Sequence, residues 1–296
     1  MPELPEVSLY VDALRRHVSG FPLRRIRIAS PFLLRTYDPP ISALNDHNVT
    51  GISNIGKRIV LEFDTDLFVV IHLMIAGRLR WKEAGVKIPR KHGHAAFDFD
   101  HGSVLFTEAG TTRRASLHVV RGRDSLAQFD RGGLDPLDSS LDAFAERLRS
   151  ENRTLKRALT DPRLFSGIGN AHSDEILLDA KLSPVRLTGR LDDEEIRRLH
   201  AAVRTSLADW IEILRQETGD AFPDKVTAFH PRMKVHGRHG LPCPVCASPI
   251  QRIAYANNET NYCAKCQTGG KILADRALSR LLRDDFPRTL EELEEK

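Results

Sequence analysis

The first seven residues, MPELPEV, place a proline and two carboxylates at the start of the chain. Removal of Met1 would leave Pro2 with a free secondary amine, whose pKa lies near that of an α-amino group, about 7.7–8.0. Such an amine is partly unprotonated at neutral pH and can attack a carbonyl carbon or the C1′ of a sugar to give an iminium. Glu3 and Glu6 follow within one short turn, near enough for acid–base work. A second interpretation is that these residues cap a first helix, where proline and acidic side chains are favoured.

Four cysteines lie in the last quarter of the chain as two Cys-x-x-Cys pairs: Cys243, Cys246, Cys263 and Cys266. Sixteen residues separate the two pairs, and this spacing suits four thiolates around one tetrahedral Zn(II) ion. Two disulfides would require an oxidising compartment, whereas the acidic, helix-like N-terminus does not resemble a secretory signal. A thioredoxin-like redox pair would account for only one of the two motifs. We therefore predict one structural zinc ion, which would supply much of the folding free energy of so small a module.

Length and composition indicate the class of protein. The chain has 296 residues, of which 41% are apolar, and its net charge is +4. The length suits two domains with a small appendage, and no apolar run approaches the roughly 18 residues of a membrane span. Basic clusters recur along the chain beside few aromatic residues, which mildly favours a polyanionic partner. We expect a cytoplasmic protein.

Apolar periodicity divides the chain into a strand-rich part and a helix-rich part. Residues 1–20 show the three- and four-residue steps of an amphipathic helix. Short strands with a hairpin turn at 100–102 are predicted at 26–28, 59–63, 67–73, 78–81, 95–99, 103–107 and 116–120. Helical patterns follow at 141–150, 153–160, 171–180, 193–216 and, as a further candidate, 223–229. Strands at this spacing indicate a sandwich or barrel, so we predict an α+β multidomain protein with segregated domains.

Several separated segments resemble the formamidopyrimidine-DNA glycosylase and endonuclease VIII family of DNA repair enzymes. In the family's order, they are MPELPEV, the Asn54-Ile-Gly-Lys57 segment, the Gly167-Ile-Gly-Asn170 turn and the four-cysteine finger. The resemblance implies an N-terminal helix on a two-layered β-sandwich, a helix–two-turn–helix domain and a zinc finger. We place the sandwich domain at 1–123, a linker at 124–140, the helical domain at 141–230, the finger at 235–275 and an acidic tail at 284–296.

The resemblance also implies a reaction on double-stranded DNA, in which a damaged base, expected to be an oxidised one, is flipped out and excised. In this interpretation Pro2 attacks C1′ and forms the covalent iminium. Glu3 acts as acid–base on the sugar, Glu6 helps to position the groups, and Lys57 holds a flanking phosphate. The abasic site is then nicked by β-elimination, and we expect the protein to be a monomer. Taken alone, Lys57 would more often be a solvated lysine at a strand edge.

Four further residues match DNA-contacting positions of the family. Met74 matches a methionine that fills the gap left by the extruded base, although methionine is more often core filler. His92 lies in the Lys91–His94 segment, which resembles one that contacts phosphate; surface histidines near a turn are the alternative. Asn170 matches an asparagine that contacts phosphate, and Lys156 matches a lysine near the lesion. Helix capping is the alternative role for Asn170.

Two segments depart from the family's pattern. In the family, a loop that commonly reads Asp-Pro-Arg-Arg-aromatic-Gly supplies an arginine for the orphaned base and an aromatic wedge. Here this loop is Glu108–Ser116, with Arg113 and Arg114 shifted and no aromatic after them. The finger tip carries Asn258 where the family commonly has an arginine that assists δ-elimination. An asparagine has no charge and cannot grip phosphate as a guanidinium does. We therefore predict weak selectivity for the opposite base and more β- than δ-elimination product.

Two other functions stay open. A binder of damaged DNA on the same scaffold, either non-catalytic or active only as an abasic-site lyase, would not excise a base. The intact set of Pro2, Glu3, Glu6 and Lys57 argues against it. A zinc-ribbon regulator would leave the N-terminal carboxylates without a role. In the leading interpretation, the stretch at 217–225 is expected near the flipped base.

Overall fold

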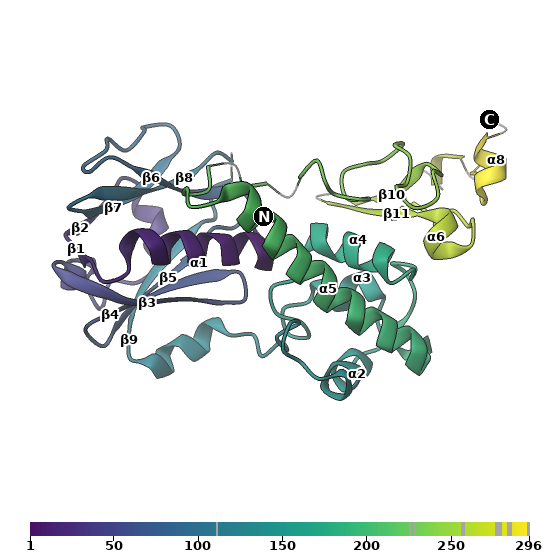
Figure 1. The fold of residues 1–296 in the computed structure, drawn as a ribbon, viewed down its shortest axis with the longest axis horizontal. Coiled ribbons are helices and arrows are strands. Elements are labelled where there is room, and N and C mark those ends of the chain that lie inside the picture. Colours follow the sequence, from purple (N-terminus) through teal and green to yellow (C-terminus); the bar gives the residue numbers. More distant parts are fainter. Residues whose placement is uncertain are drawn as a thin grey trace. The chain divides into compact units, whose positions relative to one another are not determined.

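The computed structural model describes residues 1–110, 112–224, 226–227, 229–255, 258–275, 280–282 and 286–294. Contacts divide the chain into two compact units. Unit 1 consists of Met1–Arg131 and Trp210–Ala228, and unit 2 of Gly132–Asp209 and Phe229–Lys296. Each unit has buried apolar clusters of its own, and Figure 1 labels the helices and strands of both.

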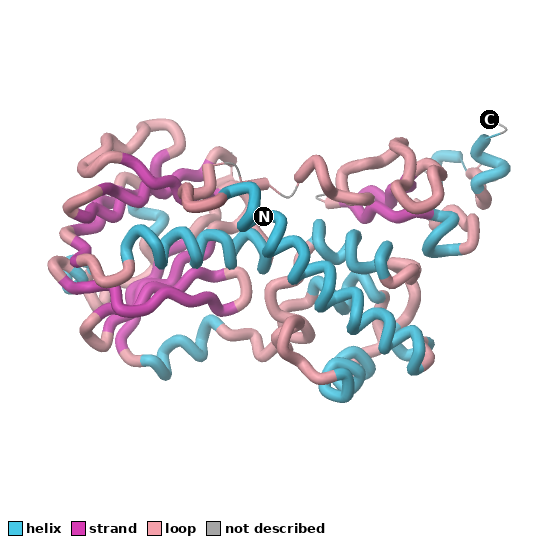
Figure 2. The backbone as a smooth tube through the Cα atoms, viewed as in Figure 1, coloured by secondary structure: helices cyan, strands magenta, loops and turns pink. Residues whose placement is uncertain are grey.

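Unit 1 is built on two antiparallel sheets. The five-stranded sheet has the order β1-β3-β4-β5-β9, and the four-stranded sheet has the order β2-β7-β8-β6. The strands are β1 Pro22–Leu23, β2 Arg25–Ile28, β3 His47–Ile55, β4 Arg58–Phe63, β5 Leu67–His72, β6 Gly77–Lys82, β7 Gly93–Phe99, β8 Gly102–Glu108 and β9 Ser116–Arg121. Figure 2 shows them in magenta. The predicted α+β fold with a two-sheet N-terminal domain is confirmed.

Helix α1 (Leu4–Val18) packs its apolar stripe against these sheets. The side chains of Val7, Tyr10, Leu14 and Val18 are at most 1% exposed and share one core cluster with strands of both sheets. Burying one large apolar side chain contributes roughly 1.5–3 kcal/mol. This stripe therefore holds the helix, and with it the chain start, on unit 1.

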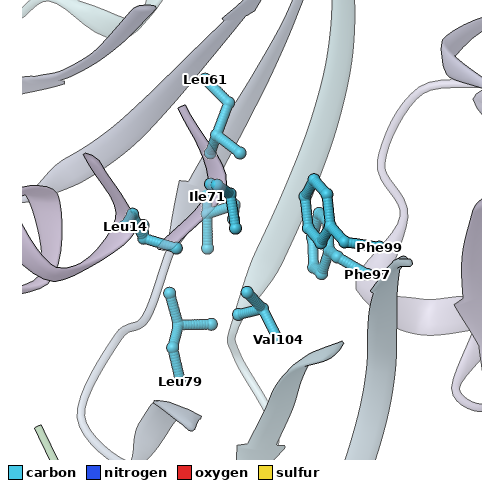
Figure 3. A pocket seen from close by; sticks show the side chains of 8 residues that line it. Leu14, Leu61, Ile71, Leu79, Phe97, Phe99 and Val104 are labelled. Atoms are coloured by element: carbon cyan, nitrogen blue, oxygen red, sulfur yellow. The ribbon is translucent and has the colours of Figure 1, made fainter. Parts of the chain in front are cut away.

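A small cavity remains in this core beside α1 (Figure 3). Its lining is apolar and includes Leu14, Leu61, Ile71, Leu79 and Phe97. The cavity measures about 10 Å³, which is at the lower limit for one water molecule, and its lining offers water no hydrogen bonds. It is a packing defect rather than a ligand site.

The hairpin predicted at 100–102 joins β7 to β8. Phe99 pairs with Gly102, so Asp100 and His101 form a two-residue turn. Glycine is required at the end of this turn, because a Cβ on residue 102 would lie 2.1 Å from the Trp81 ring. The turn prediction is confirmed.

Three parts of unit 1 differ from the sequence-based prediction. Strand β3 is not among the strands predicted from the sequence. A register shift between Val49 and Gly51 interrupts the alternation of buried and exposed residues that would indicate a strand. Residues Arg123–Phe129, which overlap the start of the linker predicted at 124–140, form a 3-10 helix. The helix considered at 223–229 is wrong, because the described residues of that stretch are not helical. Side chains of unit 1 bind this stretch instead.

Unit 2 begins with short helices. Ser140 caps the first of them by accepting the Ala143 amide at 3.2 Å. Phe144 packs on Phe165 with ring centres 4.7 Å apart, and both side chains are fully buried. The helices are α2 Leu141–Arg149, α3 Leu155–Thr160, α4 Asn170–Asp179 and α5 Asp193–Thr218, the last of which runs on into unit 1.

The cysteine-containing finger completes unit 2. Strands β10 (Ile250–Ala254) and β11 (Glu259–Cys263) pair antiparallel and lead into α6 (Ala264–Thr268). The chain after the finger folds back on it, and α8 (Leu290–Glu294) lies in this part, within the predicted acidic tail. Within the part of the chain that the structure describes, no helix has both the length and the hydropathy needed to cross a membrane.

Candidate active site and nucleic-acid interface

The chain start lies in unit 1 at the N-terminus of α1. Pro2 is buried, and Glu3 and Glu6 are each 2% exposed. The Glu6 carboxylate accepts the Glu3 amide at 2.7 Å, and the two side chains form a reciprocal capping box. The capping interpretation therefore describes the geometry correctly. It does not compete with a chemical role, because the same bonds fix two carboxylates beside the terminal amine.

Four charged side chains act on the terminal amine of Met1. Burial is the main cause that lowers the pKa of this amine; Glu3 and Glu6 raise it, and Arg78 and Lys57 lower it. The net direction for this Met1 amine is downward, because its buried surroundings disfavour the charged form. The structure thus brings Glu3, Glu6 and Lys57 together and adds Arg78. Sequence reasoning missed Arg78 because alternating arginines on a strand give no signal of their own.

Lys57 occupies a two-residue turn, Gly56-Lys57, between β3 and β4. Gly56 has φ +56°, a left-handed conformation that glycine adopts at little cost. Asn54 Nδ2 donates to the Gly56 carbonyl at 3.1 Å and supports the turn. Burial is the main cause that lowers the pKa of His72 to about 4, and the Arg58 and Lys57 charges add to it. The turn therefore places the lysine charge beside both His72 and the chain start.

The turn between β5 and β6 carries Met74. Met74 has φ +51° and is half-buried, whereas Ile75 is 66% exposed. The Gly77 amide donates to the Leu73 carbonyl at 2.9 Å and closes the turn. The more exposed apolar side chain of this turn is therefore Ile75, which sequence reasoning passed over.

The ends of the loop that follows β8 are anchored by Glu108. Its carboxylate, 1% exposed, pairs with the buried His94 at 2.9 Å and accepts the Arg114 amide at 3.1 Å. The Glu108 amide donates to the carbonyl of the half-buried His92 at 2.8 Å. Both predicted arginines of this loop, Arg113 and Arg114, are exposed. The loop is thus fixed at its base and presents two cations.

Unit 2 holds the two predicted residues of the glycine–asparagine region. Gly169 is the N-cap of α4, and the Asn170 side chain donates to the Glu259 carbonyl of β11 at 3.0 Å. Asn170 therefore links the turn to the finger hairpin instead of capping the helix. Lys156 is 12% exposed, and its Nζ lies 2.5 Å from the Asp174 carboxylate and 2.6 Å from the Asn170 carbonyl.

Two buried carboxylates of α4, Asp174 and Glu175, escaped sequence reasoning. Both are at most 1% exposed. Asp174 also accepts a bond from His236 Nδ1 at 2.8 Å, and Glu175 accepts the backbone amides of residues 234, 235 and 236 at 2.7, 2.9 and 3.0 Å. These bonds join α4 to the segment that leads into the finger. The sequence offered one signal for them: two adjacent acidic residues beside the apolar residues of a predicted helix. Acidic residues are almost never fully buried unless they are paired, so such a position indicates that the carboxylates have partners.

The four predicted cysteines converge in the finger. Their Sγ atoms all lie within 4.8 Å of one another. Burial raises the pKa of the Cys263 thiol and raises that of Cys266 to about 11, so a bound cation is needed to hold these sulfurs as thiolates. Four sulfur donors around one point suit tetrahedral Zn(II). The donor set fits one structural zinc ion, as predicted.

The tip of the finger hairpin carries Asn258. This residue is exposed, and its carbonyl accepts the Tyr255 amide at 2.8 Å. Arg252 of β10 has its guanidinium 3.4 Å from the Glu259 carboxylate. The described part of the tip therefore presents an uncharged amide, and the cation of β10 is already paired.

Three family models match the chain in the order of its parts. The formamidopyrimidine-DNA glycosylase N-terminal domain matches residues 1–114, and the formamidopyrimidine-DNA glycosylase H2TH domain matches residues 133–220. The zinc finger found in FPG and IleRS matches residues 240–269. With the two-sheet domain, the helical part and the four-cysteine centre, they define a base-excision-repair DNA glycosylase.

The similarity extends over most of the chain. The formamidopyrimidine-DNA glycosylase of Desulforamulus reducens is 33% identical over 281 residues, which cover 90% of this chain and 99% of that protein. The solved structure of the Fpg protein from Thermus thermophilus has a TM-score of 0.76 at 31% identity and covers 90% of this chain and 98% of that one. A Lactococcus lactis Fpg complex with abasic-site DNA has a TM-score of 0.80 at 25% identity, with 90% and 99% covered. The chain belongs to the formamidopyrimidine-DNA glycosylase family, whose members are DNA glycosylases and abasic-site lyases.

Proposed function

We propose that this glycosylase removes an oxidised base from double-stranded DNA through an iminium on Pro2 and then nicks the abasic site by β-elimination. The observation that carries the proposal is the buried chain start. It combines a buried Pro2, two carboxylates that are 2% exposed, and the Lys57 charge, which acts on the amine at the chain start. A neutral amine is the form that attacks carbon, and neighbouring carboxylates can accept and return protons.

The chemistry begins when the neutral Pro2 nitrogen donates its lone pair to C1′. The glycosidic bond breaks, and the base leaves with the bonding electrons and takes up a proton. The bonded nitrogen then passes its proton to the Glu3 carboxylate, Glu3 protonates the ring oxygen O4′, the C1′–O4′ bond opens and the Pro2–C1′ iminium forms. The Glu3 carboxylate then removes a proton from C2′, and the electron pair expels the 3′-phosphate. Water hydrolyses the iminium and frees Pro2, while Glu6 keeps Glu3 in position through the 2.7 Å bond to its amide.

The partner in this proposal is double-stranded DNA with a damaged base or an abasic site, bound by a monomer. The relatives support it: Lactococcus lactis Fpg structures have been solved with abasic-site DNA and with Fapy-dG DNA. Lys57 would hold a phosphate beside the lesion, since a lysine acts as a compact point charge. Further DNA contacts are proposed for Met74, His92, Arg113, Arg114, Lys156, Asn170 and Asn258.

Zinc in this proposal supplies folding free energy and takes no part in the reaction. The Cys263 amide donates to Gln267 Oε1 at 2.8 Å, and Gln267 Nε2 donates to the Leu182 carbonyl at 2.9 Å. These bonds fasten the cysteine cluster to the helical part of unit 2. A metal-filled finger would therefore hold Asn258 and the hairpin in a fixed place on that unit.

Borohydride trapping tests the mechanism. The wild-type protein, incubated with a duplex that contains one oxidised base or one abasic site, should form a covalent adduct when the iminium is reduced. Pro2→Gly should lower the yield strongly, and Glu3→Gln should lower it about 10²–10⁴-fold through loss of the acid. Pro5→Ala, which removes a proline of the same turn, is the matched control and should keep the adduct. A wild-type protein that gives no adduct, or Pro2→Gly at full yield, would rule out the Pro2 mechanism.

An abasic-lyase-only function is the second candidate. It is favoured by the loop that carries Arg113 and Arg114 without an aromatic residue after them, because such a loop has no wedge to help extrude a paired base. A nicking assay over oxidised purines, oxidised pyrimidines, uracil and abasic sites separates the two. Nicking of abasic DNA alone would select the lyase, and binding without any strand product would select a non-catalytic binder.

A further inference from the structure

A segment after α5 folds back on unit 1. This return segment consists of residues 219–224 with 226 and 227. Arg16 of α1 donates to the Gly219 carbonyl at 3.3 Å, and Phe222 packs against Tyr10 with ring centres 6.2 Å apart. The first part of the return segment is therefore bound, through both backbone and side chain, to the helix that carries the chain start.

Arg78 of β6 makes a short bond to the return segment. Its Nε donates to the Val226 carbonyl at 2.6 Å. Nη1 of the same guanidinium donates to the carbonyls of Gly77 and Ile75 at 2.6 and 3.2 Å. The Val226 side chain is 6% exposed and belongs to the main core cluster of unit 1. One side chain thus joins the return segment to the turn that carries Met74.

The same guanidinium acts on the chain start. Burial is the main cause that lowers the pKa of the Met1 amine, and this positive charge lowers it further. The other charged groups that act on the amine are Glu3, Glu6 and Lys57. The guanidinium also opposes the effect of burial on the Tyr10 phenol, whose pKa is raised to about 12. Arg78 therefore contacts the turn at 74–77 and the return segment, and its charge acts on the chain start.

We propose that Arg78 is a positioning residue, which holds the return segment and the turn at 74–77 in one arrangement around the attacking amine. The proposal rests on the proposed function, since that function supplies the attacking amine. A planar guanidinium with several fixed donors suits the task, because it binds three carbonyls at once, whereas a lysine offers one flexible ammonium. The return segment overlaps the stretch expected near the flipped base, so Arg78 would couple base binding to the nucleophile.

Three variants separate the charge of Arg78 from its hydrogen bonds. Arg78→Lys keeps a positive charge and loses the fork of donors; Arg78→Met loses both. Lys82→Met, which removes an exposed cation from the same strand, is the matched control. Amide hydrogen exchange of the free protein is the first measurement. Exchange in the return segment should rise in both Arg78 variants and stay at the wild-type level in Lys82→Met.

The pH dependence of borohydride trapping on abasic-site DNA is the second measurement. A positive charge near an amine disfavours its protonation, so removal of the Arg78 charge should shift the Arg78→Met profile to higher pH, while Arg78→Lys and Lys82→Met keep it in place. Unchanged exchange in Arg78→Met, or an unshifted profile in that variant, would overturn the proposal. A wild-type protein that traps no DNA would refute the proposed function instead, and the exchange experiment would still decide whether Arg78 holds the return segment.

Discussion

Replacing Glu175 by alanine should strongly destabilise unit 2. The carboxylate is fully buried and accepts the amides of Lys234, Val235 and His236 at 2.7, 2.9 and 3.0 Å. A hydrogen bond to a charged group contributes about 1.5–3 kcal/mol, and alanine would leave three buried donors without this acceptor. Because such terms are not additive, we expect a loss of about 3–6 kcal/mol in the free energy of unfolding. Folded domains have about 5–15 kcal/mol in total, so the loss would be large.

Urea denaturation measures this loss. With an m value of about 3 kcal/mol per molar, the midpoint should fall by about 1–2 M. Glu175→Gln keeps the shape and one acceptor oxygen, and should lose about half as much. Glu146→Ala, at an exposed position of α2, is the control and should stay within about 0.5 kcal/mol of wild type. A Glu175→Ala midpoint equal to that of the control would refute the view that this carboxylate holds α4 to the segment before the finger.

Three further predictions concern the metal, the finger tip and the half-buried His72. Chelation should raise amide exchange across residues 243–266 and leave that of unit 1 unchanged, because the metal supplies the folding free energy of the finger; persistent protection would contradict this. Asn258→Arg should increase the share of δ-elimination product on a denaturing gel, and an unchanged ratio would mean that the tip does not reach the reacting phosphate. His72 should titrate by NMR near pH 4. Because the pKa of His72 is lower in the folded than in the unfolded state, the unfolded state binds the proton first as the pH falls. The free energy of unfolding should therefore decrease from pH 6.5 toward pH 4. An NMR titration midpoint near 6.5 would contradict the burial of His72 as the cause of its shift.

Features with a local physical cause could be predicted from the sequence. The two Cys-x-x-Cys pairs each place two sulfurs within reach of one ion, and all four sulfurs do converge. The three- and four-residue spacing of apolar residues in α1 predicts a helix with one buried face, and the turn residues at 100–102 predict a hairpin. The structure contains both. In each case the spacing along the chain decides the geometry, because the interacting residues lie a few positions apart or on one periodic face.

Contacts between distant segments could not be predicted. Arg78 and Val226 are 148 positions apart, and Glu175 and Val235 are 60 apart. The local pattern at 223–229 indicates a candidate helix, but the described residues of this stretch are not helical. Arg78 of β6 binds the Val226 carbonyl in this stretch instead. Its conformation is therefore decided by partners that no window of sequence contains.

The sequence by itself determined the chemical groups: a proline that can supply a secondary amine, two glutamates one turn apart, a lysine in a glycine turn and four thiols with zinc spacing. Only the tertiary structure decided their surroundings. It buries Glu3 and Glu6, adds the Arg78 charge at the amine, and makes Ile75 the more exposed side chain of the turn beside Met74. The physical reason is that burial and Coulomb interactions depend on distance in space, which the fold sets, and not on separation along the chain.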